Sequence, residues 1–60
     1  MPIVHIDLLP RDAEVKRKVA KEVTEAICRA ASCPPEAVSI IFYDMPAESY
    51  AVAGKLHCDK

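Results

Sequence analysis

Pro2 is the first candidate for chemistry in this chain, because removal of Met1 would leave its ring nitrogen as a free secondary amine. A free α-amino group titrates at about pH 7.7–8.0 in short peptides, and apolar surroundings or a nearby cation lower its pKa. An amine that is neutral near pH 7 can accept a proton and return it, which is general acid–base catalysis. The alternative is structural, since a proline at this position often only begins a strand.

Two further side chains are candidates to complete a site around such a base. Arg11 follows Pro10 where the first apolar segment ends, and its planar guanidinium can hold a carboxylate or stabilise an enolate. Tyr50 can form the wall of an apolar pocket. Both residues also have plainer interpretations, because an exposed arginine is usually solvated and a tyrosine in an oligomer often lies at an interface.

A metal site is a competing interpretation of the His and Cys residues. In a small metal-binding domain, the ligands would be His5, His57 and Cys58. Structural zinc sites, however, depend on paired ligands at short spacing, and the segment "CRAASC" does not have that spacing. The sequence therefore predicts no metal ligands and no cofactor, and it favours the cysteines as small apolar residues or surface thiols.

Composition limits the class of partner. The chain has 60 residues, of which 52% are hydrophobic, and a net charge of −1 from 8 Lys and Arg against 9 Asp and Glu. It has no basic patch for nucleic acid and no apolar run of about 18 residues for a membrane span. The start "MPIVHIDLLPRD" does not resemble a signal peptide, and the cysteines, Cys28, Cys33 and Cys58, are odd in number. These features predict a cytoplasmic protein without disulfides.

The apolar spacing predicts an α/β (α+β) fold, a single domain over residues 1–60 built on one β-α-β unit. Residues 3–9 alternate in the manner of a strand. Apolar residues recur every four positions over residues 13–31, which predicts a helix. β-branched and aromatic residues over 38–43 predict a second strand, and a helical crossover makes the two strands parallel.

The remaining segment, residues 49–56, predicts a short hairpin or arm with a turn near Gly54. A β-α-β unit of this size cannot cover the apolar surface of this chain, because one helix covers only one face of a two-stranded sheet. We therefore expect a homo-oligomer in which the arm reaches a neighbouring subunit.

On these residues the chain resembles a small tautomerase of the 4-oxalocrotonate tautomerase family. The resemblance rests on "MPIVHI" at the start, "RDAEVK" from Arg11, the helical stretch "EVTEAICRA", and "DM" before the arm "SYAVAGKL". It covers nearly the whole chain, with about one residue fewer at the first turn. It implies the same fold, assembly as a hexamer (a trimer of dimers), sites built from more than one subunit, and a reaction of aromatic catabolism that needs no cofactor.

The resemblance also implies a role for individual residues. Pro2 matches the amino-terminal general base, which moves a proton in 2-hydroxy-dienoates such as 2-hydroxymuconate to give unsaturated 2-oxo acids. Arg11 matches the arginine that binds the substrate carboxylate and draws electron density. Leu9 and Tyr50 match apolar walls of the pocket, and Ser39 stands where the family has a second arginine that polarises the 2-oxo group.

Ser39 is the departure with the largest chemical consequence. Loss of a charged donor to a developing oxyanion costs on the order of 3 kcal/mol, or a hundredfold in rate. Either another cation enters the site, for which Lys55 and Arg17 are candidates, or turnover of the usual diacid is weak, or the substrate differs. The alternative function is therefore a catalytically weak or inactive oligomeric module in which Pro2 only begins a strand.

Overall fold

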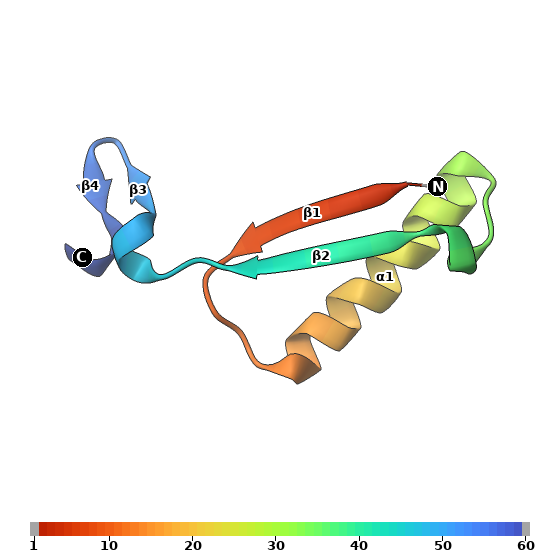
Figure 1. Cartoon of the computed structure of the whole chain (residues 1–60), viewed down its shortest axis with the longest axis horizontal. Helices are drawn as coiled ribbons and strands as arrows, with labels where there is room; N and C mark the ends of the chain where they lie inside the picture. The colour runs from red at the N-terminus through yellow and green to blue at the C-terminus, as the bar shows by residue number, and fades with distance from the viewer. Residues whose placement is uncertain (1, 60) are drawn as a thin grey trace.

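The fold is a parallel strand pair crossed by one helix, with a small hairpin beyond the sheet (Figure 1). The computed structural model describes residues 2–59, so Met1, whose removal would free the Pro2 nitrogen, lies outside the described residues. The elements in chain order are β1 (Ile3–Leu8), α1 (Ala13–Ala31), β2 (Ser39–Asp44), β3 (Ala51–Val52) and β4 (Lys55–Leu56), with single 3-10 turns at Pro35–Ala37, Ala47–Ser49 and His57–Asp59. The predicted β-α-β unit with a C-terminal hairpin is confirmed.

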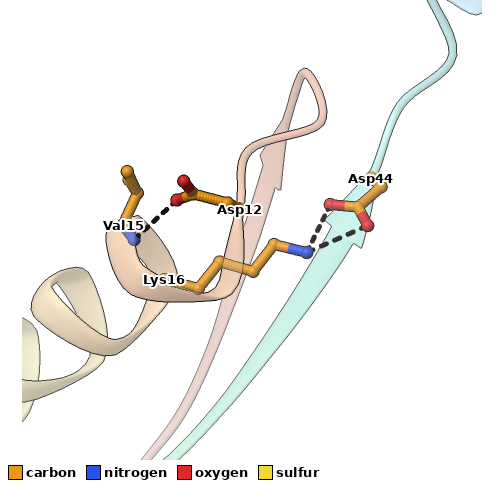
Figure 2. A network of polar contacts seen from close by, with 4 residues as sticks. All are labelled: Asp12, Val15, Lys16 and Asp44. Atoms are coloured by element: carbon orange, nitrogen blue, oxygen red, sulfur yellow. Dashed lines mark hydrogen bonds and ion pairs between the residues drawn. The ribbon is translucent and has the colours of Figure 1, made fainter.

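Local chemistry sets both ends of α1. Asp12 has an extended backbone, and its carboxylate accepts a hydrogen bond of 3.1 Å from the backbone N–H of Val15 (Figure 2). This N-cap satisfies one of the free donors of the first turn. Ser32 ends the helix in the left-handed conformation, with φ of 55°, and Pro34 follows closely and cannot continue it. Within residues 2–59, no helix is long and apolar enough to cross a bilayer.

The parallel ladder places Pro2 beside the start of β2. Ile3 pairs with Ser39 and Leu8 pairs with Asp44. One step before the first pair, the backbone N–H of Ser39 donates to the carbonyl of Pro2 at 3.0 Å. The backbone of Pro2 joins the ladder as an acceptor, a role in which the missing N–H of proline costs nothing.

The helix covers only one face of this sheet. Alternate residues of both strands are half-buried on the face toward α1, namely Val4, Ile6, Leu8, Ile40 and Phe42. On the opposite face Ile3, Ile41 and Tyr43 are 57%, 48% and 56% exposed. None of residues 2–59 is fully buried, so the single chain has no closed core. The uncovered apolar face indicates assembly with further copies.

Replacing Ile41 by lysine should break this assembly. The charge would have to be desolvated at an apolar interface, which costs several kcal/mol. We expect I41K to dissociate at concentrations at least about tenfold higher than the unchanged protein, measured by sedimentation or native mass. The control E22K, on the exposed side of α1, should keep the assembly mass. An I41K protein with unchanged assembly would contradict an interface on this face.

An ion pair ties the first turn of α1 to the end of β2. The Lys16 Nζ lies 2.7 Å from Oδ1 and 2.9 Å from Oδ2 of Asp44 (Figure 2). The side chains are 25% and 48% exposed, so the pair contributes no more than about 1 kcal/mol to stability. The ion pair holds the start of α1 beside the end of β2. It therefore also fixes the position of the preceding loop, which contains Arg11.

The hairpin has a tight two-residue turn. Ala53 and Gly54 join β3 to β4 with φ of 55° and 82°, and two positive φ angles are what a type I′ hairpin turn requires. The predicted turn near Gly54 is therefore confirmed. The hairpin stands beyond the ends of β1 and β2 and does not cover the sheet (Figure 1). Its Val52 is 60% exposed, which supports the expectation that the arm packs on a neighbouring subunit.

Candidate functional site

Leu9, Arg11 and Tyr50 lie together at the end of the sheet where β1 and β2 finish. They line a hollow of about 380 Å³, together with Asp7, Leu8 and Met45. Leu9 and Arg11 belong to the loop between β1 and α1, and Tyr50 directly precedes β3. Pro10 helps to place them, because a proline cannot continue the ladder and the chain turns away from the sheet there.

A second hollow adjoins the first. It has a volume of about 510 Å³ and is lined by Leu9, Tyr50, Val52, Lys55 and His57. Leu9 and Tyr50 border both hollows, so they form a shared apolar wall. The rings of Tyr50 and His57 lie 5.9 Å apart between centroids at 45°, a tilted contact. From the sequence His57 is a candidate only as a metal ligand. Its place in this wall follows from the pairing of β3 with β4.

Pro2 and Ser39 lie at the opposite end of the sheet. β1 separates Pro2 from Leu9, and six strand residues span roughly 20 Å. A small substrate that touches Arg11 of one chain cannot reach the Pro2 nitrogen of the same chain. The predicted site residues therefore form two groups in a single chain, Pro2 with Ser39 and Leu9 with Arg11 and Tyr50.

The two cations considered as replacements for the second arginine have different positions. Lys55 lines the larger hollow. Arg17 is exposed on α1 and lines neither hollow. The geometry therefore favours Lys55 over Arg17 as a group near Leu9 and Tyr50.

The candidate metal ligands do not gather. Among residues 2–59, no three His, Cys, Asp or Glu side chains lie close enough to hold a metal ion. His5 is on the uncovered side of β1, whereas His57 and Cys58 are in the arm. Cys28, Cys33 and Cys58 are all free thiols.

The surroundings of Cys28 disfavour its thiolate form. Desolvation raises the pKa of Cys28, and the neighbouring Cys33, Glu36 and Glu25 raise it further. A raised pKa lowers the thiolate fraction at neutral pH, and the thiolate is the form that reacts. We expect iodoacetamide to alkylate Cys28 more slowly than free cysteine at pH 7.5, with a midpoint in pH above that of free cysteine. Site-resolved mass spectrometry checks this, and a midpoint below that of free cysteine would contradict it.

Comparison with known proteins identifies the family. A sequence model described as "Tautomerase enzyme" matches residues 2–60. The chain belongs to the tautomerase family. A protein of Streptococcus pneumoniae named "Probable tautomerase" is 46% identical to this tautomerase over 57 residues, which cover 93% of this chain and 95% of that one.

Solved structures of tautomerase homologues have the same fold. YwhB, a homologue of 4-oxalocrotonate tautomerase, superposes with a TM-score of 0.92 at 33% identity over 98% of each chain. A 4-oxalocrotonate tautomerase isozyme of Methylibium petroleiphilum gives 0.93 at 32% identity, covering 97% of this chain and 92% of that one. The resemblance drawn from the sequence is confirmed, and the protein is a tautomerase, which is an isomerase.

Proposed function

We propose that this tautomerase converts 2-hydroxy-dienoates, of which 2-hydroxymuconate is the type, into unsaturated 2-oxo acids with the Pro2 amine as general base. The observation that carries the proposal is the first hollow, where Arg11 lies beside the apolar wall of Leu9 and Tyr50. A guanidinium next to an apolar wall suits a substrate with a carboxylate and an unsaturated carbon chain. Every group that the reaction needs is then supplied by protein side chains and the amino terminus.

The proton transfer uses only one base. The neutral Pro2 nitrogen takes the proton of the 2-hydroxyl group, the O–H electron pair becomes the C=O bond, and the double bonds shift along the chain. The protonated nitrogen then returns the proton to a carbon of the former diene, which restores the amine. Arg11 holds the carboxylate and stabilises the negative charge of the dienolate between the two steps.

The other predicted residues set the surroundings of the base. Leu9 and Tyr50 exclude water, and an apolar environment disfavours the ammonium form and so lowers the pKa of the amine. Ser39 is bound to Pro2 through a backbone hydrogen bond. In the proposed site its hydroxyl donates one neutral hydrogen bond to the 2-oxo group. It supplies less stabilisation than a charged donor would.

The proposed site is built from more than one copy of the chain. Pro2 and Ser39 come from one copy, and Leu9, Arg11 and Tyr50 come from another. The separation of roughly 20 Å along β1 supports this division, as does the uncovered face of the sheet. A hexamer arranged as a trimer of dimers is the assembly we propose.

Turnover of 2-hydroxymuconate by the trimmed, assembled protein tests the function. Ketonisation should be faster with protein than in buffer, followed by the change in ultraviolet absorbance, with no added metal or cofactor. Intact mass must first show that Met1 is absent. If a trimmed oligomer leaves 2-hydroxymuconate and its monocarboxylate analogues at the buffer rate, the chain is the inactive assembly module that the neutral Ser39 allows.

A further inference from the structure

One face of the hairpin carries both the apolar wall and a cation. Side chains alternate along a strand, and directly paired residues project from the same face. Val52 pairs with Lys55, and the Tyr50 carbonyl accepts a hydrogen bond of 2.7 Å from the backbone N–H of His57. Tyr50, Val52, Lys55 and His57 therefore share one face, and together with Leu9 they line the larger hollow.

The shared wall has a cation on each side. Arg11 lines the smaller hollow and Lys55 lines the larger one, with Leu9 and Tyr50 bordering both. The ion pair found in the described part of the chain joins Lys16 to Asp44, so within residues 2–59 neither cation has a carboxylate partner. Asp7 also lines the smaller hollow but forms no ion pair with Arg11. Two cations on either side of an apolar wall complement a ligand with an apolar middle and an anionic group at each end.

We infer that Lys55 binds the anionic group of the substrate that lies opposite the carboxylate held by Arg11. The role of Lys55 in the reaction rests on the proposed function, whereas the anion-binding site itself does not. Arg11 holds one carboxylate, the carbon chain lies along Leu9 and Tyr50, and the ammonium of Lys55 meets the other end. Lys55 thereby supplies positive charge that Ser39 does not. The backbone N–H of His57 donates to the Tyr50 carbonyl and closes the base of the hairpin that carries Lys55.

A pair of matched ligands isolates the second carboxylate. Muconate and sorbate share a six-carbon diene, and sorbate has a methyl group where muconate has its second carboxylate. Dissociation constants are measured by calorimetry or NMR on the trimmed, assembled protein. We expect the unchanged protein to bind muconate at least about tenfold more tightly than sorbate. K55M should remove that preference by weakening muconate alone, and K55R should retain most of it.

The controls separate charge from folding and from catalysis. K18M removes an exposed lysine of α1 and should leave both affinities unchanged. Circular dichroism and assembly mass verify each variant, and K55R gives a second test if K55M does not assemble. A K55M protein with the original preference would overturn the inference, as would an unchanged protein that binds the two ligands equally or not at all. If muconate binding depends on Lys55 but the protein does not turn over 2-hydroxymuconate, the proposed function is refuted and the anion site is supported.

Discussion

Replacement of Pro2 by alanine should lower kcat/KM for 2-hydroxymuconate by about 10²–10⁴-fold, the usual contribution of a positioned general base. The trimmed variant still begins with an amine, but a primary one that rotates freely. The proline ring fixes the direction of the nitrogen lone pair, and the Pro2 carbonyl is held by the N–H of Ser39 at 3.0 Å. Alanine preserves that backbone bond, so the expected loss lies in the rate and not in the fold.

Steady-state kinetics on trimmed P2A checks this expectation. Intact mass establishes that both proteins begin at position 2, and native mass establishes equal assembly. Because the backbone bond to Ser39 is retained, the free energy of unfolding should change little. A kcat/KM for P2A within a few-fold of the unchanged protein would show that Pro2 only begins the strand.

Mixed assemblies of P2A and R11A should recover about a quarter of the unchanged activity, well above the activity of either variant alone. In the proposed assembly each site takes Pro2 from one copy and Arg11 from another. When equal amounts of the two variants assemble at random, half of the sites have an intact Pro2. Independently, half of the sites have an intact Arg11, so about a quarter have both. If both groups came from the same copy, every mixed site would lack one of them.

The mixing experiment contains its own controls. Each variant is denatured and refolded alone, and the two are also mixed without denaturation, so that exchange of subunits is required for recovery. Refolded unchanged protein sets the full activity. Failure of a verified mixed oligomer to exceed the separate variants would contradict the division of the site between copies.

Local pattern was sufficient to predict the elements. The four-residue apolar spacing predicts α1. In the structure Asp12 caps its start and Pro34 follows its end, and each acts through neighbours a few residues away. β2 begins at Ser39 and ends at Asp44, one residue later at each end than predicted, because Val38 closes the preceding 3-10 turn by donating to the Pro35 carbonyl at 3.1 Å.

The arrangement of the site depended on geometry that no local pattern contains. The separation of Pro2 from Arg11 comes from the length and direction of β1, and proximity to a second copy cannot be read from the sequence of one. The ion pair of Lys16 with Asp44 joins residues 28 positions apart. Lys55 was one of two candidate cations, and only the pairing register of β3 with β4 puts it on the face with Tyr50.

Catalysis by Pro2 requires its nitrogen to be a free and largely neutral amine at the pH where the enzyme works. An NMR titration of the trimmed, assembled protein labelled with ¹⁵N-proline measures this directly. We expect Pro2 to lose its proton below the pH range of ordinary α-amino groups, about 7.7–8.0. We also expect kcat/KM to rise with pH through the same midpoint. A Pro2 nitrogen still protonated well above neutrality, with kcat/KM independent of its titration, would show that Pro2 is not the general base.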